Sequence, residues 1–418
     1  MKNCRLAITA CGLLFLPAAA DELPAPARRT AIAANSLAPP PPNPTNRVAD
    51  DPAARKLGQS LFFDTNLSSN GQISCATCHN PSKAFTDGRT VSKGLNEGVV
   101  NTPTLLGAAH QRWLFHDGRA DTLWSQALTP LESTLEMGST RTDIARYIAS
   151  NAPLNSAYVA IFGALPDMAD EKRFPAGAKP GTPQWDTMTS KDQHDVTKTF
   201  VNVGKAIEAY ERQLVPGESA FDKWARSLAA GERDDTLISD AALRGFTLFA
   251  NDAGCTQCHF GPMISDLEFH DLSLPASAQT VSPLPGRGSG YPALRSSEFR
   301  ADGPWSDAPK STLARRAASA RIGTEHWGAV RTPSLRNVAV TAPYMHSGQF
   351  ETLSDVLAFY NTLEGQVRRH HHAEAVLVPL NLTEAQLSDL EAFLRAITGT
   401  PPPKSLSIPP AGYSIPQR

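Results

Sequence analysis

The sequence lacks three features that would indicate a membrane-spanning, nucleic-acid-binding or β-rich protein. Beyond residue 20, no apolar run approaches the ~20 residues that a membrane helix needs. The formal net charge of −2 argues against nucleic acid or an anionic membrane as a partner. No alternation of apolar and polar residues is long enough to predict a half-buried strand. We therefore expect a mostly α, globular protein with no membrane span and no nucleic-acid partner.

Cysteine is also scarce, with six in 418 residues. Cys4 and Cys11 fall in residues 1–20, where basic residues, an apolar stretch and small residues follow one another as in a signal peptide. We predict export to the periplasm and cleavage near Asp21. Lipoprotein cleavage before Cys11 is the alternative, but the apolar run ahead of Cys11 is short for it. The mature chain then has four cysteines and none to spare for a structural disulfide.

The remaining cysteines form two CxxCH motifs. These are Cys75-Ala76-Thr77-Cys78-His79 and Cys255-Thr256-Gln257-Cys258-His259. Two thiols three positions apart can bond to the two vinyl groups of one haem, and the adjoining histidine can bind its iron. A pair of redox disulfides or a zinc site is the alternative. Because a histidine follows the second cysteine twice, the pattern favours two covalent haems with His79 and His259 as iron ligands.

An internal repeat predicts two haem modules. Gly58-Gln59-Ser60-Leu61-Phe62 and Gly245-Phe246-Thr247-Leu248-Phe249 share the pattern G-x-x-L-F ahead of the two haem motifs. Farther on, Thr383 and Gln386 form a capping box that predicts the start of a helix. We expect a mostly α fold of two cytochrome c-like haem domains with long irregular loops. The predicted parts are a signal peptide (1–20), a Pro-rich extended arm (21–46), an N-terminal haem domain (47–225), a C-terminal haem domain (226–400) and an extended tail (401–418).

Over roughly residues 50–400, a series of ordered motifs resembles the bacterial dihaem cytochrome c peroxidase and MauG family. Besides the first haem motif, the matches are Leu61-Phe62-Phe63-Asp64, Ala84-Phe85-Thr86-Asp87-Gly88, Asn101-Thr102-Pro103, Asp117-Gly118-Arg119, Glu136-Met137-Gly138, Thr332-Pro333-Ser334-Leu335-Arg336-Asn337 and Pro343-Tyr344-Met345-His346. The resemblance implies that an N-terminal haem reacts with hydrogen peroxide and that a C-terminal haem stores or relays electrons. It also implies one calcium ion between them.

The resemblance implies an open first haem. Conventional peroxidases of the family often carry a blocking histidine at the place of Leu95, and no histidine occurs here between His79 and His110. We therefore expect a five-coordinate haem on His79, as in MauG. His110 is the alternative blocking ligand.

Three residues carried over by the resemblance form the expected peroxide pocket. Glu136 is the candidate acid–base group that moves a proton between the two peroxide oxygens. Gln126 is its hydrogen-bonding neighbour, and Pro130 shapes the pocket. A lone glutamate is usually a solvated surface residue, and only the family register favours a catalytic role for Glu136.

The same register predicts a sixth ligand for the second haem. Tyr360 stands where conventional peroxidases carry methionine and MauG carries tyrosine. A phenolate stabilises oxidised iron, whereas a thioether favours reduced iron. A core tyrosine is the alternative interpretation, and Met345 and Met263 are weaker candidate ligands.

The resemblance also implies the calcium ligands. They are a side-chain oxygen of Asn101 and the backbone carbonyls of Thr341 and Pro343. Hard oxygen donors of this kind suit Ca²⁺.

Two positions depart from the family pattern. His116 stands between the expected haems where the family usually has tryptophan, and Trp113 and Trp124 are the nearby residues that could substitute. Ala253 stands where MauG carries the tryptophan that passes charge to its protein substrate. Maturation of a quinone cofactor by that route is therefore not expected.

Three functions follow from these patterns. The leading one is an exported dihaem oxidoreductase that reacts with hydrogen peroxide and oxidises a protein or cytochrome partner through a Tyr-ligated second haem. The second is a conventional cytochrome c peroxidase that takes electrons from a small cytochrome c or a copper protein. The third is a non-catalytic electron-transfer cytochrome.

Overall fold

The computed structural model describes residues 23–35, 37–275, 284–368 and 374–411. The predicted signal peptide lies outside these residues. No helix within these ranges is long and apolar enough to cross a membrane.

The prediction of a mostly α fold is confirmed, since the described residues hold fourteen α-helices and one antiparallel sheet of two short strands. The helices are α1 (Ala25–Ala34), α2 (Pro52–Phe63), α3 (Cys75–Cys78), α4 (Leu123–Glu132), α5 (Arg141–Ser150), α6 (Ala152–Phe162), α7 (Pro183–Asp186), α8 (Ser190–Glu211), α9 (Ala220–Ala229), α10 (Asp240–Ala250), α11 (Arg287–Ser296), α12 (Thr312–Ser319), α13 (Leu353–Thr362) and α14 (Glu384–Ala396). The strands are β1 (Phe269–His270) and β2 (Val330–Arg331). The capping box at Thr383 begins α14, as predicted.

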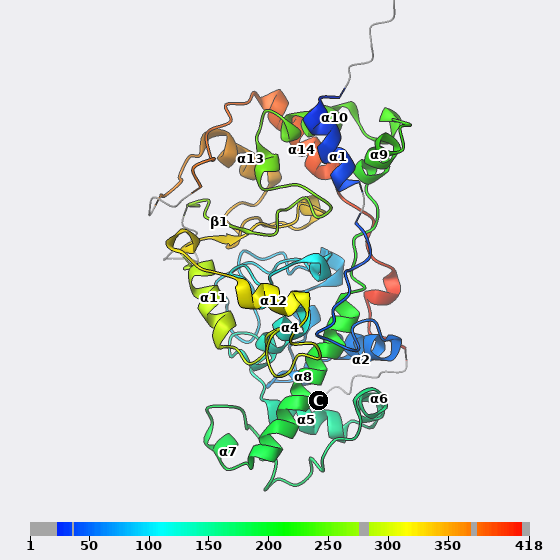
Figure 1. The fold of residues 1–418 in the computed structure, drawn as a ribbon, viewed down its shortest axis with the longest axis vertical. Helices are drawn as coiled ribbons and strands as arrows, with labels where there is room; N and C mark the ends of the chain where they lie inside the picture. The colour runs from blue at the N-terminus through cyan, green and yellow to red at the C-terminus, as the bar shows by residue number, and fades with distance from the viewer. Residues whose placement is uncertain (1–22, 36, 276–283, 369–373, 412–418) are drawn as a thin grey trace, which may run out of the picture.

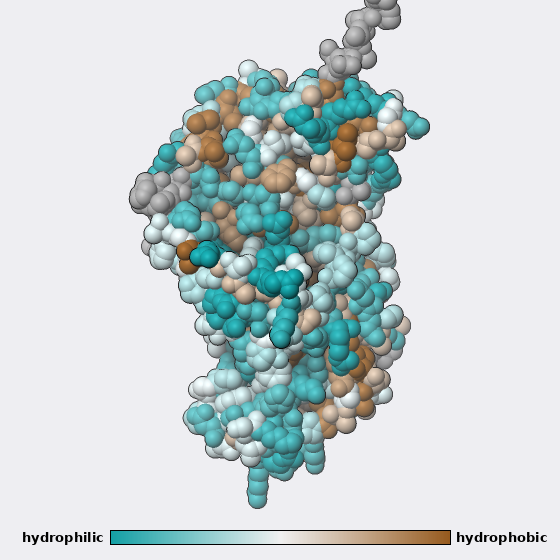
Figure 2. All heavy atoms as spheres, viewed as in Figure 1, coloured by the Kyte–Doolittle hydropathy of each residue, from teal (hydrophilic) through white to brown (hydrophobic). Residues whose placement is uncertain are grey.

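Two hydrophobic cores divide the molecule into lobes, seen one above the other in Figure 1. The first lobe is built mainly on α2, α4, α5, α6 and α8, around Trp124 and Phe200. The second lobe is built on α1, α9, α10, α13 and α14, around Phe221, Phe246 and Phe393, whose rings pack 5.1–5.4 Å apart. On the face drawn in Figure 2, hydrophobic side chains form only small separate patches.

Each lobe is centred on one close crossing of two helices, and the glycine of the G-x-x-L-F repeat lies at each crossing. A Cβ built on Gly58 of α2 would lie 1.8 Å from the carbonyl oxygen of Ala206 in α8. A Cβ built on Gly245 of α10 would likewise lie 1.8 Å from the carbonyl oxygen of Asp389 in α14. The repeat therefore encodes the same backbone-to-backbone packing twice, which only glycine permits.

The prediction of an extended arm is wrong for residues 25–34, which form α1. Ala27, Ala31 and Ala34 are buried on one face of this helix, which packs on α9 and α10. Alanine has the highest helix propensity, and prolines ahead of a helix or in its first turn are well tolerated. The residues after α1 are extended and cross to the first lobe, where Trp124 donates a 3.0 Å hydrogen bond to Thr45 Oγ1.

The predicted boundary after residue 225 also needs correction, because it cuts through α9, whose apolar face belongs to the second core. The division into two haem domains otherwise stays a prediction. The tail beyond residue 401 returns to the first lobe, where Gln59 donates 2.7 Å hydrogen bonds to the carbonyls of Ser405 and Ile408. The two lobes are thus tied together at both chain ends.

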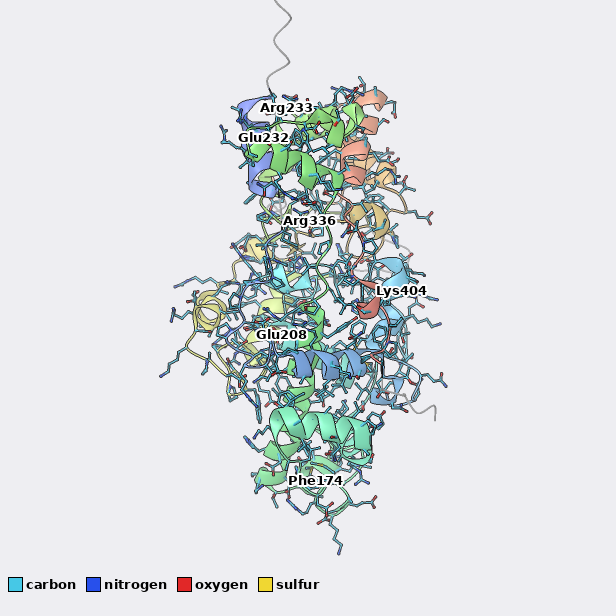
Figure 3. The ribbon with its side chains drawn as sticks, turned by 90° about the vertical axis from the view of Figure 1, so that its right-hand side faces the viewer. Phe174, Glu208, Glu232, Arg233, Arg336 and Lys404 are labelled. Atoms are coloured by element: carbon cyan, nitrogen blue, oxygen red, sulfur yellow. The ribbon has the colours of Figure 1, made fainter. Side chains whose placement is uncertain are left out.

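A buried arginine holds the second lobe together. Arg336, which Figure 3 labels near the boundary between the lobes, donates two hydrogen bonds to Asp222 of α9 at 2.9 and 3.0 Å. It also donates to the carbonyls of Ala34 at the end of α1 and of Pro262 after the second haem motif. One side chain therefore fixes two helices and a haem-binding loop.

Candidate haem and peroxide sites

Each CxxCH motif forms a single helical turn, and each motif histidine is held in the same way. His79 Nδ1 lies 3.1 Å from the carbonyl oxygen of Phe85, and His259 Nδ1 lies 3.0 Å from that of Ile264. A carbonyl only accepts, so Nδ1 carries the proton in both rings. Burial lowers the pKa of both imidazoles. Each histidine is therefore neutral and keeps the lone pair of Nε2 for a metal.

The accepting carbonyls are aimed by an uncommon backbone conformation. Phe85 has φ 59° and Ile264 has φ 48°, both in the left-handed region that bulky residues rarely adopt. The same strained turn occurs after both motifs. Such a turn stays populated only where the surrounding structure holds it, which points to a shared binding task.

The thiols and their surroundings fit covalent haem better than the alternatives. All four cysteines are free in the described chain, so neither motif forms a disulfide. Cys258 lies with Asp266 and His270 in a group whose ligand atoms are within 4.8 Å of one another. However, His270 lies between two carboxylates, 2.7 Å from Asp266 and 2.6 Å from Glu374, and its hydrogen bonds with Asp266 first, then with Cys258 and Glu374, raise its pKa to about 11. A doubly protonated imidazole has no lone pair for zinc.

Glu136 lies beside the first motif. Burial is the main reason that the pKa of the Cys75 and Cys78 thiols is raised, and the charge of Glu136 contributes at both sulfurs. Burial also raises the pKa of Glu136 itself, against the opposing effects of Arg119 and of a hydrogen bond with Ser133. The carboxyl thus stands in a partly dry site next to the expected first haem.

Backbone hydrogen bonds fix the position of Glu136. Its N–H donates to the carbonyl of Ser133 at 3.0 Å, and the next N–H, of Met137, donates to the carbonyl of Pro130 at 3.1 Å. Pro130 and Gln126 belong to α4, so the three pocket residues are held by one helix and the turn that follows it. On the other side, the N–H of Leu95 donates to the carbonyl of Glu136 at 2.9 Å.

His110, the alternative blocking ligand, is engaged elsewhere. Its Nε2 lies 2.8 Å from the carbonyl oxygen of Ala38 in the segment that follows α1. Burial lowers the pKa of His110. Leu95, at the place of the family's blocking histidine, is joined to Glu136 through its backbone N–H, and its aliphatic side chain lies by Gly138.

The three residues expected between the haems separate in the structure. His116 is partly buried, and its Nε2 lies 2.9 Å from the carbonyl oxygen of Asn101, while desolvation lowers its pKa to about 3. Trp113 packs against the guanidinium of Arg287, at the contact of the two lobes. Trp124 is fully buried in the first core, so the structure supports the core interpretation for this tryptophan.

Tyr360 lies at the second motif. It belongs to α13, and burial, followed by the charges of Cys255 and Cys258, raises its pKa. The phenol is therefore close to the sulfurs that would hold the second haem. Met263 is engaged at the lobe contact instead, where a Cβ built on Gly107 would lie 3.3 Å from its terminal methyl carbon.

The expected calcium ligands come from two segments that are bonded to each other. The N–H of Asn101 donates to the carbonyl of His346 at 2.9 Å, and its Nδ2 donates to the carbonyl of Arg89 at 2.6 Å. The side-chain oxygen of Asn101 is thus the atom left for a cation. Pro343, after a cis peptide bond, lines a cavity of about 500 Å³ on the same side with Arg89. This donor set fits a hard cation.

Comparison with known proteins agrees with this geometry. Residues 52–230 match the family model described as di-haem cytochrome c peroxidase. The methylamine utilization protein MauG of Methylorubrum extorquens is 31% identical over 365 residues, covering 86% of this chain and 80% of that protein. The chain belongs to the dihaem cytochrome c peroxidase and MauG family. Cytochrome-c peroxidase IdrP2 of Pseudomonas sp. is 30% identical, with 87% and 85% of the two chains covered.

The family fold is seen in a solved structure as well. The diheme peroxidase BthA of Burkholderia thailandensis matches with a TM-score of 0.63 and 24% identity, covering 84% of this chain and 86% of that one. Membership in the family makes the protein a peroxide-linked haem oxidoreductase with two c-type haems. The roles of Glu136, Gln126, Pro130, Tyr360 and the calcium ligands stay predictions.

Sequence reasoning missed three side chains that organise these sites. They are Arg336, which ties α1 and α9 to the second motif loop, His270, which bridges two carboxylates, and Arg287, which lies among aromatic rings. Arg336 lies in one of the motifs that carry the family resemblance, but the sequence did not show which segments its side chain joins. Each of the other two has one partner four residues away, Asp266 for His270 and Tyr291 for Arg287, but the partners that complete each site, Glu374 and Trp113, are far away in the sequence.

Proposed function

We propose that this protein is a periplasmic, MauG-like dihaem enzyme that reacts with hydrogen peroxide at the His79 site and oxidises a partner protein or cytochrome. The observation that carries the proposal is the backbone hydrogen bond that joins Leu95, at the place of the family's blocking histidine, to Glu136 next to the first motif. No imidazole is bonded there among the described residues. Peroxide then meets no side-chain ligand that has to leave first.

Haem bound at the two motifs supplies the iron that reacts with peroxide and the second centre that shares the oxidising equivalents. The chain supplies the proton chemistry. Glu136 takes a proton from the bound oxidant and returns it to the leaving oxygen, a transfer suited to a carboxyl whose pKa is raised. Gln126 donates a hydrogen bond that orients the oxidant, and Pro130 holds the turn that carries Glu136.

At the second site, His259 and Tyr360 are the residues that would hold the haem iron. A phenolate ligand lowers the haem potential and favours the oxidised state, so such a site would store charge rather than bind peroxide. Asn101, Thr341 and Pro343 would hold a calcium ion, which would tie together the segments that carry them.

A conventional cytochrome c peroxidase, supplied with electrons by a small cytochrome c or a copper protein, is the second candidate. The family includes such enzymes, and His116 lacks the easily oxidised indole that suits charge sharing between haems. A stoichiometric peroxide titration of the fully ferric protein, followed by optical and EPR spectra, separates the two. Joint loss of both ferric signals supports the proposal, whereas no reaction until one haem is reduced supports the conventional peroxidase.

A further inference from the structure

A buried guanidinium lies where the two lobes meet. Arg287, at the start of α11, is only 2% exposed. Its Cζ lies 4.3 Å from the ring centre of Trp113, 4.5 Å from that of Phe269 and 5.3 Å from that of Tyr291. These rings come from the loop before α4, from β1 and from α11 itself. One cation therefore stands among three aromatic rings from separate segments.

The charge of Arg287 is not neutralised by an ion pair within the part of the chain that the structure describes. Its Nη1 donates a 2.6 Å hydrogen bond to the carbonyl of Gly118. Asp117, the carboxylate that acts on it most strongly, is itself paired with Arg119 at 3.1 Å. Burial lowers the pKa of Arg287 to about 10, so the guanidinium stays protonated at neutral pH.

Two tryptophans lie at the start of α11. Trp113, which packs on Arg287, stands three residues before His116, the position between the expected haems. A Cβ built on Gly288, the next residue of α11, would lie 2.9 Å from Cε3 of Trp327, which is 54% exposed. Trp113 is therefore the ring of this cluster that is nearest in sequence to the expected contact between the haems.

Oxidation of an indole creates a positive charge on the ring. A fixed cation 4.3 Å away in a buried site opposes that charge and makes Trp113 harder to oxidise. We propose that Arg287 is a guard residue that keeps oxidising equivalents off Trp113. Arg287 is a positioning residue for charge, not a catalytic one.

The inference rests on the proposed reaction with peroxide, which supplies the oxidant. If the guard is removed and no electron donor is present, one indole and one water lose two electrons and two protons, and the indole gains one oxygen atom. The electrons and protons reduce one hydrogen peroxide to two waters at the haem sites. The product is a hydroxylated tryptophan, which peptide mass spectrometry detects without any activity assay.

The test compares Arg287→Met, which removes the charge but keeps a long side chain, with Arg287→Lys, which keeps the charge. After excess peroxide without a donor, we expect several-fold more oxidation of Trp113 in Arg287→Met than in the wild type. Arg287→Lys should resemble the wild type. Trp185, a half-buried tryptophan in α7 at the far end of the first lobe, is the internal control. Equal oxidation of Trp113 in wild type and Arg287→Met overturns the inference.

Two further measurements keep the inference testable if Arg287→Met does not fold or if peroxide does not react. Trp113→Phe should leave the lifetime of the peroxide-oxidised protein unchanged, and a longer or shorter lifetime would show that Trp113 carries charge in the wild type and would overturn the guard. Photogenerated tris(bipyridine)ruthenium(III) oxidises the same proteins without peroxide. More Trp113 oxidation in Arg287→Met under that oxidant supports the guard even if the proposed peroxide reaction fails, and equal oxidation there overturns it.

Discussion

The backbone N–H of Leu95 donates a 2.9 Å hydrogen bond to the carbonyl oxygen of Glu136. This bond joins the loop that follows the first haem motif to the turn that follows α4. The side chain of Leu95 packs toward Gly138 on the same turn, since a Cβ built there would lie 2.6 Å from Leu95 Cδ1. Residue 95 is therefore held beside Glu136 and Gly138, so a substitution there acts next to the expected peroxide site.

Leu95→His is expected to close the first haem. An imidazole at this place can reach toward the iron as a sixth ligand, so the ferric spectrum of this haem should change from high spin to low spin. Peroxide should then react slowly until the second haem is reduced. Leu95→Gln, which adds polarity without an imidazole, is the matched control and should stay high spin. A high-spin Leu95→His protein would show that the loop cannot carry a ligand to the iron.

Glu136→Gln is expected to slow the reaction with peroxide by about 10²–10⁴-fold, the usual contribution of a positioned acid–base group. The resting spectra should not change, because Glu136 is not an iron ligand. Stopped-flow mixing with peroxide measures the rate. Glu97→Gln, an exposed carboxylate on the Leu95 loop, is the control. Rates equal to the wild type would remove Glu136 from the mechanism.

The peroxide reaction should also depend on pH through Glu136. Burial raises the pKa of this carboxyl, and only its ionised form can accept a proton. The rate should therefore fall as the pH decreases through the raised pKa. Rates measured across the acid range for wild type and Glu136→Gln test this, since the variant should lose the dependence. A variant that keeps the same pH profile would assign it to another group.

Tyr360→Phe is expected to remove the sixth ligand of the second haem. Its ferric spectrum should lose the features of phenolate ligation, and peroxide should no longer produce an oxidised state shared by both haems. Optical and EPR spectra report both changes. Tyr344→Phe, a buried tyrosine of the same lobe, is the matched control. Unaltered spectra in Tyr360→Phe would support a core role for this tyrosine.

Gly58→Ala and Gly245→Ala should each destabilise the protein by about 3 kcal/mol, because the new Cβ meets a backbone carbonyl that cannot swing aside. Thermal or urea unfolding measures the loss. Gly231→Ala is the control, since it has φ 82° but nothing within 4 Å of the new Cβ, and should cost only about 1 kcal/mol. Similar losses in all three would mean that the helix crossings relax.

Glu211→Gln should stabilise the protein more at high pH than at low pH. Burial, followed by the charge of Glu208, raises the pKa of Glu211 from 4.5 to about 8. Between these values the unfolded chain releases a proton that the folded protein keeps, so wild-type stability falls as the pH rises. The difference in urea midpoint between Glu211→Gln and the wild type should therefore be larger near pH 8 than near pH 4.5. Glu232→Gln, at an exposed glutamate, is the control. A stability difference between Glu211→Gln and the wild type that does not change with pH would contradict the raised pKa of Glu211.

The sequence by itself determined the features that depend on neighbouring residues. Cys75, Cys78 and His79 lie within one helical turn, so their covalent chemistry is fixed by spacing alone. The capping box of α14 is equally local. The G-x-x-L-F repeat was also legible in the sequence, although only the structure explains its glycine by a backbone contact with a distant helix. The alanines of α1 favour a helix, but the prolines around them led to the prediction of an extended arm.

Only the tertiary structure decided which distant side chains meet. Leu95 contacts Glu136, which lies 41 positions further along the chain, and Arg287 contacts Trp113 from the other half of the chain. The free energy of such contacts depends on burial and on charges that packing brings together, and no local pattern records either. The sequence therefore specified where haem is attached. Packing decided what surrounds it, because the dielectric environment and the neighbours of a buried group belong to the whole fold.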